Sequence, residues 1–403
     1  MKVVVVGAGP AGSAAAIWLA RGGADVVVID KATFPRDKCC GDGLTTGALR
    51  RLETLGLDPS TMPSWQRVDD IVIRSVSGRT QTFPLPRGRG TYAAVVRRTE
   101  LDAALVALAR ANGATVREAC GVTGISVAAG GTGVHVATET GEVISGDYLI
   151  GADGVWSATR KLSGTSDEDG YLGEWHAFRQ YRKSGTPASR DLWVLFEQDL
   201  RPGYAWSFPL ADDTVNVGIG ILRRPGEPTK DLGRRFREVL ERPQFAAVIG
   251  DSIEESPAKA WPIPARVEKS ALSALDGRVL FVGDAARATD PMTGEGIGQA
   301  LETAEYAATA ILTSARPAQR YADVVARGLA RDNRMAGWLS RNGLTHRKGI
   351  RAALRIAGLN GWTRRNFARW LFEDEPRAVL ATPRRWHRRF LNRDGAFPPN
   401  PKL

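Results

Sequence analysis

Runs of β-branched residues alternate with helix-forming segments at the start of the chain. Lys2–Val6 consists almost entirely of valine, a pattern typical of a central strand that is buried on both faces of a parallel sheet. An alanine-rich helix to about Arg21 follows, and a second apolar run, Val26–Ile29, ends at Asp30. The pattern predicts a strand–helix–strand unit that opens an α/β domain.

The later pattern predicts that this α/β domain is split by a β-rich insertion. Residues 31–47 are expected to form a loop, and residues near 69–85 alternate as strands do. Further predicted elements are a helix over Thr99–Asn112 and strands at Thr115–Arg117, Val134–Thr138 and Tyr148–Ile150. Short strands around aromatic residues and one helix near 229–241 are expected between about 170 and 265. A buried strand at Arg278–Val282 and a long helix over Gly296–Leu312 then return to the α/β domain.

The composition narrows the class of protein. The chain has 403 residues, 43% hydrophobic and 25% charged, which predicts a soluble protein of two closely packed domains. Its three cysteines (Cys39, Cys40, Cys120) include no C-x-x-C pair, and its four histidines lack H-E-x-x-H spacing. We therefore expect no disulfide framework and no metal site, and a cytoplasmic location. No segment has the roughly 18 consecutive apolar residues needed to span a bilayer.

The net charge of +11 is concentrated at one end. Residues 331–403 hold 17 basic and 5 acidic residues, a net of +12, together with Trp338, Trp362, Trp370 and Trp386. Basic side chains interleaved with tryptophan suit peripheral contact with an anionic membrane. A solvated helical cap explains the composition equally well. Nucleic acid is not expected, because no recognition motif accompanies the charge.

A glycine-rich turn joins the first strand to the first helix. Gly7, Gly9 and Gly12 have G-x-G-x-x-G spacing. The first glycine permits the turn, the second lets the backbone approach a pyrophosphate, and the third lets helix and strand pack closely. The helix start at Ala11 offers free N–H groups to phosphate, and Asp30 is placed to accept ribose hydroxyls. This dinucleotide site also explains why the first 20 residues resemble a signal peptide in composition.

Two further loops follow strands of the same domain. They are Gly151-Ala152-Asp153-Gly154, and Gly283-Asp284-Ala285-Ala286 followed by Pro291-Met292-Thr293-Gly294-Glu295-Gly296-Ile297. With the glycine turn, they resemble the glutathione-reductase-type (Rossmann-like) FAD fold of the aromatic hydroxylase superfamily. The resemblance implies that Asp153 lies at the FAD site and that Asp284 holds the ribityl chain. It also implies that Gly296 and Ile297 open a helix whose positive end faces the pyrimidine edge of the flavin, where reduced flavin is negative.

The loop after the second strand narrows the resemblance. Phe34-Pro35-Arg36-Asp37-Lys38-Cys39-Cys40-Gly41-Asp42-Gly43-Leu44 is similar to the flavin-side loop of the geranylgeranyl reductase family, which commonly has Lys-Pro-Cys-Gly. Cys40 matches the family's cysteine, whereas Cys39 stands in place of its proline. The resemblance implies FAD contacts at Cys40, Gly41, Gly43, Arg98 and Val122. A purely structural role for Cys40 as a small buried residue is the alternative, and Arg97 is the alternative to Arg98.

Aromatic residues recur at every second position of the segment Arg201–Pro209. Tyr204, Trp206 and Phe208 share one face of the expected strand. The segment resembles the Tyr-x-Trp-x-Phe-Pro signature of the same reductases, which lines their isoprenoid cavity, so these three residues are predicted to bind substrate. An apolar aromatic face suits a polyprenyl chain, which has nothing to hydrogen-bond. It equally suits an ordinary sheet core.

Together, the resemblances predict an FAD-dependent reductase of isoprenoid C=C bonds. The expected substrate is a prenyl diphosphate, a prenylated quinone such as menaquinone, or a prenyl ether lipid. NADPH or another low-potential donor would reduce the FAD, and only one glycine fingerprint is present, so no separate nicotinamide domain is expected. Cys40 and Tyr204 are candidate catalytic proton donors by position, with an ordered water as the alternative.

Two other functions stay open at this point. One is an FAD-dependent monooxygenase of an aromatic substrate, which shares the fold; the other is a non-catalytic, membrane-associated flavoprotein. A flavin halogenase is disfavoured, because no Trp-x-Trp-x-Ile-Pro segment is present. The predicted regions are 1–165 (first part of the FAD domain, with small β insertions), 166–270 (β-rich substrate domain), 271–330 (return of the FAD domain) and 331–403 (basic helical C-terminal region).

Overall fold

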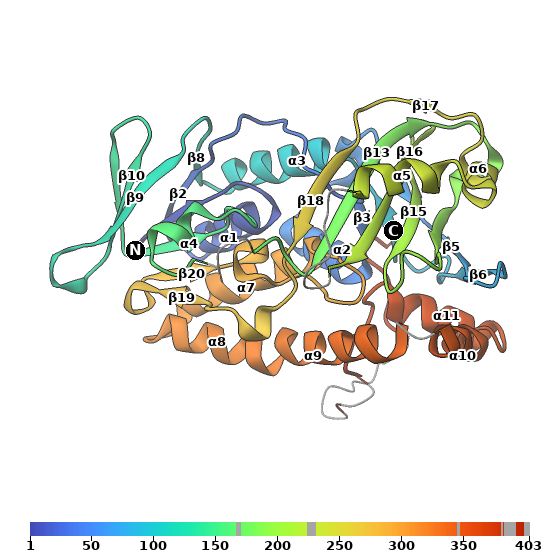
Figure 1. Cartoon of the computed structure of the whole chain (residues 1–403). Coiled ribbons are helices and arrows are strands. Elements are labelled where there is room, and N and C mark those ends of the chain that lie inside the picture. Colours follow the sequence, from blue (N-terminus) through green and yellow to red (C-terminus); the bar gives the residue numbers. More distant parts are fainter. Residues whose placement is uncertain (167–170, 224–230, 345–346, 380–381, 383–391, 399–403) are drawn as a thin grey trace, which may run out of the picture.

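A computed structural model describes the chain except for residues 167–170, 224–230, 345–346, 380–381, 383–391 and 399–403. Its α/β domain is built on a six-stranded sheet (Figure 1). In spatial order the strands are β19 (Ser273–Ala274), β20 (Val279–Phe281), β12 (Tyr148–Gly151), β1 (Lys2–Val6), β2 (Asp25–Ile29) and β8 (Thr115–Arg117). All neighbouring pairs are parallel except β19–β20. The carboxyl ends of the parallel strands therefore meet at one edge, where ligands of such sheets bind.

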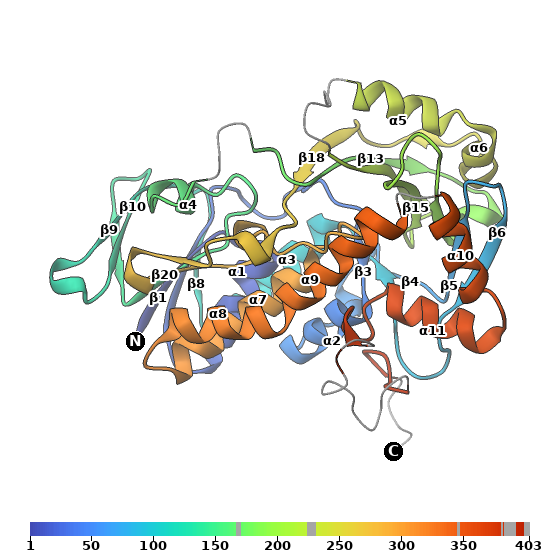
Figure 2. The ribbon, with the colours of Figure 1, turned by 60° about the horizontal axis from the view of Figure 1, so that its bottom comes forward.

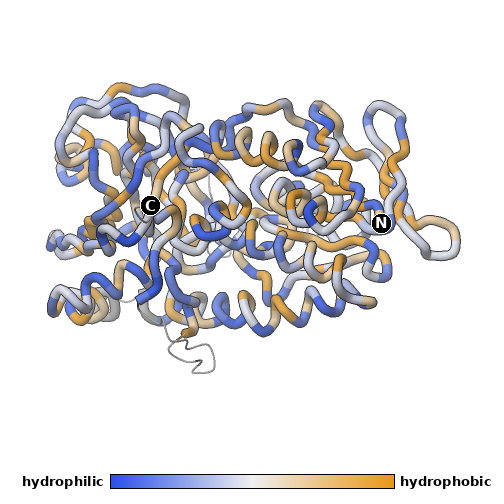
Figure 3. The backbone as a smooth tube through the Cα atoms, turned by 180° about the vertical axis from the view of Figure 1, so that it is seen from behind, coloured by the Kyte–Doolittle hydropathy of each residue, from blue (hydrophilic) through white to orange (hydrophobic). Residues whose placement is uncertain are grey.

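Helices cover this sheet because its central strands have no polar face. Val3, Val4 and Val5 of β1 are completely buried. Three helices pack together in the layer around them: α1 (Pro10–Arg21), α3 (Arg98–Ala111) and α7 (Ile297–Thr313). The backbone is mostly hydrophobic through the central strands near the N-terminus (Figure 3). An antiparallel sheet of β9 (Val122–Val127), β10 (Val134–Thr138) and β11 (Val143–Gly146) extends from one end of the domain (Figure 1).

A second, mixed sheet of eight strands stands beside the α/β domain (Figures 1 and 2). Its strands are β17 (Ile253–Glu254), β13 (Trp175–Lys183), β16 (Thr214–Leu222), β15 (Tyr204–Pro209), β14 (Leu192–Leu195), β5 (Asp70–Arg74) and β6 (Thr80–Pro84), with β18 (Lys259–Ile263) paired to β13. Helices α5 (Leu232–Leu240) and α6 (Pro243–Ile249) pack on one face of it. The strands β5 and β6 come from the region predicted as the first part of the FAD domain, so the chain enters this sheet twice.

The C-terminal helices tie the two parts together. Helices α8 (Pro317–Arg327) and α9 (Leu329–Leu339) run in line beneath the α/β domain (Figure 1). Helices α10 (Arg347–Ala357) and α11 (Gly361–Leu371) lie against β5 and β6, where the rings of Phe83 and Phe367 are 5.1 Å apart. Within the described residues, no helix is both long and apolar enough to cross a membrane.

The predicted fold class is confirmed, and most of the predicted elements are present with bounds shifted by one or two residues. The loop expected over residues 31–47 is wrong at its end, where β3 (Gly43–Leu44) and the start of α2 (Thr46–Leu55) lie. Thr45 caps α2 by accepting the Ala48 N–H at 3.4 Å. The helix predicted near 229–241 is present as α5, but α6, which follows it and begins at a proline, was not predicted. The first residues of that predicted range, to residue 230, lie outside the described residues.

Candidate active site

The glycine turn leaves space for a ligand at one of its three glycines. Gly7 has φ +100°, and a Cβ there would lie 2.4 Å from the Ala152 carbonyl oxygen. A Cβ on Gly12 would lie 1.7 Å from the Gly7 carbonyl oxygen. At Gly9, by contrast, the flexible Arg36 guanidinium at 3.3 Å is the only group of the described part of the chain within 4 Å. Gly7 and Gly12 are therefore required by the fold itself, whereas the face of Gly9 is open to a bound group.

The structure brings the three predicted motifs into contact at the carboxyl edge of the sheet. A Cβ added to Gly7 would lie 2.9 Å from the Asp153 amide nitrogen, and a Cβ added to Gly283 would lie 3.0 Å from Ala11 Cβ. Among the described residues, no side chain caps the N-terminus of α1 or of α7. Gly296 occupies the cap position of α7 and Ile297, which is buried, begins the helix. Two uncapped helix ends therefore offer unpaired N–H groups and positive dipole ends to an anionic ligand.

The three predicted aspartates differ in their surroundings. Asp30 accepts the Ala8 amide at 2.7 Å and the Ala32 amide at 2.8 Å, which fixes the glycine turn while leaving lone pairs for a ribose. Asp153 is turned into its own loop, where the Ser157 hydroxyl and the Thr159 amide and hydroxyl donate to it. Its carboxyl thus supports the start of α4 (Ala158–Leu162).

The third aspartate, Asp284, has carboxylate oxygens that are largely available to a ligand. Asp284 has a single long contact among the described residues, 3.5 Å from the Thr289 hydroxyl. The point for a Cβ on Gly296 is 3.7 Å from its Oδ1 atom. A carboxylate with unused lone pairs beside an uncapped helix suits the hydroxyl-rich ribityl chain predicted for this position. Val122, the remaining predicted contact of the α/β part, begins β9 and is partly buried; the preceding Cys120 donates its N–H to the Asp30 carbonyl at 2.8 Å.

The flavin-side loop packs its cysteine against Arg98. Burial raises the pKa of the Cys40 thiol, and the nearby Arg98 guanidinium opposes this shift only in part. Arg98 is buried and donates twice to Asp102, at 2.8 Å each. Arg97, the alternative, points away and pairs with Asp212 at 2.9 Å and Glu255 at 3.0 Å. Of the two arginines, Arg98 is therefore the one beside the predicted FAD contacts.

Lys38 joins this site although sequence reasoning assigned it no role. Its ammonium lies 3.7 Å from the centroid of the Trp261 ring. Burial lowers its pKa to about 8, and the charge of Asp284 acts in the opposite direction. A cation that faces Asp284 is well placed to balance negative charge on a bound cofactor. In the sequence, only the position of Lys38 in the flavin-side loop pointed to a role at the cofactor site.

The predicted aromatic face is present and lies on the flavin-side loop. The ring centroids of Tyr204 and Trp206, and of Trp206 and Phe208, are each 6.0 Å apart, which places the three rings in one row. The point for a Cβ on Gly41 is 3.5 Å from the Phe208 ring and 3.6 Å from the Trp206 ring. The point for a Cβ on Gly43 is 3.3 Å from Phe208. The row therefore borders the cofactor loop as well as the core of the second sheet.

Asn216 on β16 fixes this junction and was missed in the sequence. It accepts the Trp206 indole N–H at 3.0 Å and donates to the Cys40 carbonyl at 2.8 Å and to Asp42 at 2.9 Å. Asp42 also accepts the Tyr181 hydroxyl at 2.5 Å. Burial raises the pKa of Asp42 to about 6, although these donors act to lower it. One amide thus holds the aromatic row and the cysteine loop together.

Comparison with known proteins agrees with this geometry. Residues 1–320 match a protein family described as FAD binding domain. The chain is 35% identical over 339 residues to menaquinone reductase of Mycolicibacterium smegmatis, covering 76% of this chain and 75% of that protein. It is 31% identical over 309 residues to digeranylgeranylglycerophospholipid reductase 1 of Methanopyrus kandleri, covering 74% and 77%. The structure of a geranylgeranyl bacteriochlorophyll reductase-like protein from Thermoplasma acidophilum superposes with a TM-score of 0.76 at 21% identity, covering 96% and 99%.

The fold and the site define an FAD-dependent oxidoreductase. The open face of Gly9, the two uncapped helix ends and the free side of Asp284 all fit FAD. The chain belongs to the geranylgeranyl reductase family within the FAD binding domain family.

Proposed function

We propose that this protein is a reductase that saturates C=C bonds of an isoprenoid chain. The observation that carries the proposal is the contact between the aromatic row of β15 and the Cys40–Gly43 loop. We further propose that Gly7, Gly9, Ala11, Gly12, Asp30, Cys40, Gly41, Gly43, Arg98, Val122, Asp153, Asp284, Gly296 and Ile297 make up the FAD site. Tyr204, Trp206 and Phe208 would face the prenyl chain, because an apolar surface at the reacting centre positions an alkene that offers no polar handle.

A prenylated quinone such as menaquinone is the substrate that we propose first. The relative with 35% identity bears the name menaquinone reductase. Prenyl diphosphates and prenyl ether lipids are the other candidates, and the relative from Methanopyrus is named for an ether lipid of this kind. NADPH or another low-potential donor is proposed as the reductant.

In the proposed reaction the site would exclude water from the alkene and place the uncharged Cys40 thiol and Tyr204 phenol beside it. Bound and reduced, FAD supplies two electrons and one hydrogen to one alkene carbon. The protein must then hold the double bond still and deliver a proton to the other carbon. Burial raises the pKa values of the Cys40 thiol and the Tyr204 phenol. The Tyr204 hydroxyl donates to the Thr293 carbonyl, so its proton is already engaged.

Anaerobic single-turnover reduction tests this function. The protein is reduced with dithionite and mixed with menaquinones of increasing prenyl length, and the flavin spectrum and product mass are followed. After the ring is returned to the quinone form in air, we expect the lipid to have gained two mass units in its prenyl chain, because reduction of the ring alone would be reversed by this step. In a parallel aerobic assay, substrate-dependent oxygen consumption without a saturated product would instead identify a monooxygenase. Flavin that no prenyl lipid reoxidises would favour a non-catalytic flavoprotein.

Trp206→Ala is expected to lower turnover increasingly as the prenyl chain lengthens. Trp206 is 5% exposed, and burying an aromatic ring of this size contributes roughly 2–3 kcal/mol of apolar contact. FAD content, measured by absorbance, should be unchanged. The matched control is Trp193→Ala on β14, whose indole N–H bonds the Ala188 carbonyl at 2.8 Å on the other face of the same sheet. A loss that is equal for short and long substrates would assign Trp206 to the sheet core alone.

We also propose that the C-terminal helices contact an anionic membrane from the cytoplasmic side. Four large apolar side chains of this region are more than half exposed: Trp338, Ile356, Leu359 and Trp362. The basic residues Arg351 and Arg355 of α10, together with Arg79, line a cavity of about 170 Å³, and none of the three pairs with a carboxylate among the described residues. Trp370 is partly buried and donates to the Arg377 carbonyl, and Trp386 lies outside the described residues.

Three of the five acidic residues of this region, Glu373, Asp374 and Glu375, are largely or fully buried, whereas Asp394 is exposed and pairs with Arg89. Asp374 is buried and pairs with Arg50 and Arg369. Glu373 accepts the Thr45 hydroxyl at 3.0 Å. A basic surface that also exposes aromatic and aliphatic side chains is typical of helices that lie in a membrane interface.

Replacing Arg351 and Arg355 together by glutamine is expected to weaken binding to phosphatidylglycerol liposomes. Each basic residue near such a surface contributes roughly 1 kcal/mol, so the Kd should rise roughly 30-fold. The control is the double change Arg234→Gln and Arg237→Gln on α5, which lies on the opposite side from α10 (Figure 1) and removes the same charge. Sedimentation with liposomes measures both. Equal losses in the two variants would favour the solvated cap.

A further inference from the structure

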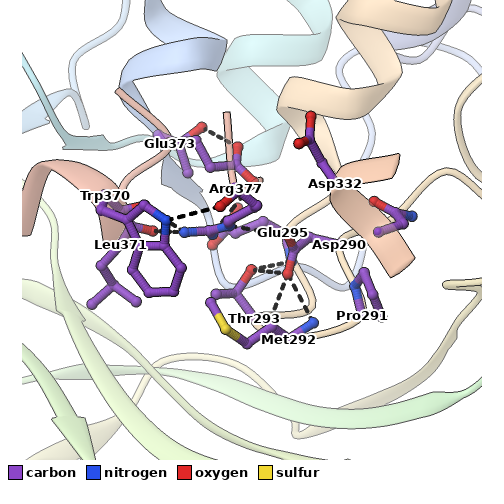
Figure 4. Close-up of polar contacts among 12 residues, drawn as sticks. Asp290, Pro291, Met292, Thr293, Glu295, Asp332, Trp370, Leu371, Glu373 and Arg377 are labelled. Atoms are coloured by element: carbon purple, nitrogen blue, oxygen red, sulfur yellow. Dashed lines mark hydrogen bonds and ion pairs between the residues drawn. The ribbon is translucent and has the colours of Figure 1, made fainter. Parts of the chain in front are cut away.

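A tight turn after Asp290 carries Glu295 (Figure 4). Asp290 Oδ1 accepts the amides of Met292 and Thr293, at 2.8 Å each. The backbone closes the turn, because Gly294 N donates to the Asp290 carbonyl at 3.0 Å and Asp290 N donates to the Glu295 carbonyl at 2.8 Å. The second sheet holds the same turn from the other side, since the Tyr204 hydroxyl donates to the Thr293 carbonyl.

The Glu295 carboxyl lies where the flavin-side loop meets the aromatic row. Its Oε1 atom is 3.6 Å from the point for a Cβ on Gly43, and two atoms of the Phe208 ring lie 3.3 and 3.6 Å from that same point. The side chain is partly buried, and no hydrogen bond or ion pair reaches its carboxyl from the residues that the structure describes. A carboxyl without a partner beside a substrate-facing ring is placed to act on whatever occupies that face.

The charged groups around the Glu295 carboxyl determine which of the neighbouring carboxyls remains protonated. Among the described residues, five ionisable groups interact with Glu295. They are Asp290 of the same turn, Glu373 and Arg377 of the C-terminal region, Tyr204 of β15 and Cys40 of the cysteine loop. Three carboxyls thus share one guanidinium.

The hydrogen bonds and ion pairs of the cluster determine which of its three carboxyls is stabilised as a carboxylate. Arg377 pairs with Asp290 at 3.2 Å and lies 3.5 Å from Glu373. Glu373 also accepts from Gln299 at 2.7 Å and from Thr45 at 3.0 Å. Glu295 receives none of these donors, so it is the carboxyl for which ionisation costs most. Burial, with Glu373 and Asp290 adding to it, raises the pKa of Glu295 to about 8.

We propose that Glu295 is the proton donor for the alkene that this site reduces. This rests on the proposed function. The π bond of the alkene breaks and two C–H bonds form: one carbon receives hydrogen with an electron pair from the reduced cofactor. The other carbon receives the Glu295 proton, which leaves a carboxylate. Glu373 and Asp290 raise the energy of that carboxylate and favour its reprotonation from solvent before the next turnover.

The pH dependence follows from the same contacts. Only protonated Glu295 donates, so the rate constant for alkene reduction should be constant below about pH 7 and fall tenfold per unit above the pKa of about 8. Glu373→Gln removes a neighbouring negative charge and should therefore move the fall to lower pH without abolishing it. This coupled shift separates a proton donor from a residue that only shapes the site.

Glu295→Gln is the direct test, in three measurements on the full chain. Infrared difference spectra of the cofactor-free protein between pH 6 and pH 9 should contain a protonated-carboxyl band that is absent in the variant. FAD binding should be unchanged within about twofold. The single-turnover rate of alkene reduction in menaquinone at pH 7 should fall by roughly 100-fold or more, and the fall above pH 8 should disappear. Glu295→Asp, which keeps the acid, should restore part of the rate.

The outcomes separate this inference from the function on which it rests. A wild-type protein that saturates no prenyl lipid contradicts the proposed function, whereas the infrared band still tests the protonated state of Glu295. If the wild type reduces menaquinone and Glu295→Gln keeps both rate and pH profile, Glu295 is not the donor and the Cys40 thiol or water takes that role. Absence of the infrared band also overturns the inference.

Discussion

Gly9→Leu is expected to give a folded protein that does not bind FAD. No described backbone lies within 4 Å of the Cβ point at Gly9, so the leucine has room in the protein but occupies the open face of the turn. It would displace the pyrophosphate from the N–H groups of α1, and the loss of two hydrogen bonds to charged phosphate weakens binding by roughly 100-fold or more. Flavin absorbance after gel filtration and a fluorescence titration of the apoprotein with FAD measure the effect.

The control for Gly9→Leu is Gly185→Leu. Gly185 is exposed, and apart from its chain neighbours no described atom lies within 4 Å of the position that a Cβ would take, so this protein should remain yellow. Circular dichroism must show both variants folded. Gly12 is unsuitable for the comparison, because its Cβ would lie 1.7 Å from a carbonyl oxygen of the turn itself. Retention of FAD with wild-type affinity by Gly9→Leu would contradict the assignment of the glycine turn as the phosphate site.

Asn216→Ala is expected to lower the free energy of unfolding by about 3 kcal/mol and to reduce turnover. The change removes the partner of the Trp206 indole, the Cys40 carbonyl and the Asp42 carboxyl together. Each buried polar group left without a partner costs about 1–3 kcal/mol, reduced where water enters the space. Urea unfolding followed by tryptophan fluorescence measures the loss.

The control for Asn216→Ala is Asn342→Ala. Asn342 is exposed, and among the described residues its side chain makes one hydrogen bond, to the Trp338 carbonyl at 3.0 Å. Its removal should change the free energy of unfolding by no more than about 0.5 kcal/mol. A loss at Asn216 as small as this would mean that the aromatic row and the cysteine loop do not depend on the amide between them.

Local sequence was enough to predict the α/β framework, because each part of it leaves a local pattern. The valine run of β1 is followed directly by three glycines, and the spacing of these glycines predicts the turn that they form. The alternation of Tyr204, Trp206 and Phe208 likewise states which residues share a face of a strand. The start of α2 was missed although Thr45 is a good capping residue, because the glycines and cysteines before it favour a loop.

Contacts between distant segments decided the rest of the site. Asn216 is 176 residues from Cys40, and no local pattern marks a buried asparagine as their link. Arg98 and Arg97 are equivalent in the sequence, and only the packing of α3 directs one toward Cys40 and the other toward Asp212.

The sequence by itself determined that this chain is built to hold a dinucleotide at the carboxyl edge of a parallel sheet, because helix ends and glycine turns are local devices. Only the tertiary structure decided which acid near the substrate face keeps its proton. Glu295 stands next to a glycine in a common turn motif, and its chemistry depends on Glu373 and Arg377 from a segment some 80 residues away. Ionisation depends on the sum of all surrounding charges and on burial, and both are set by the folded arrangement of distant segments.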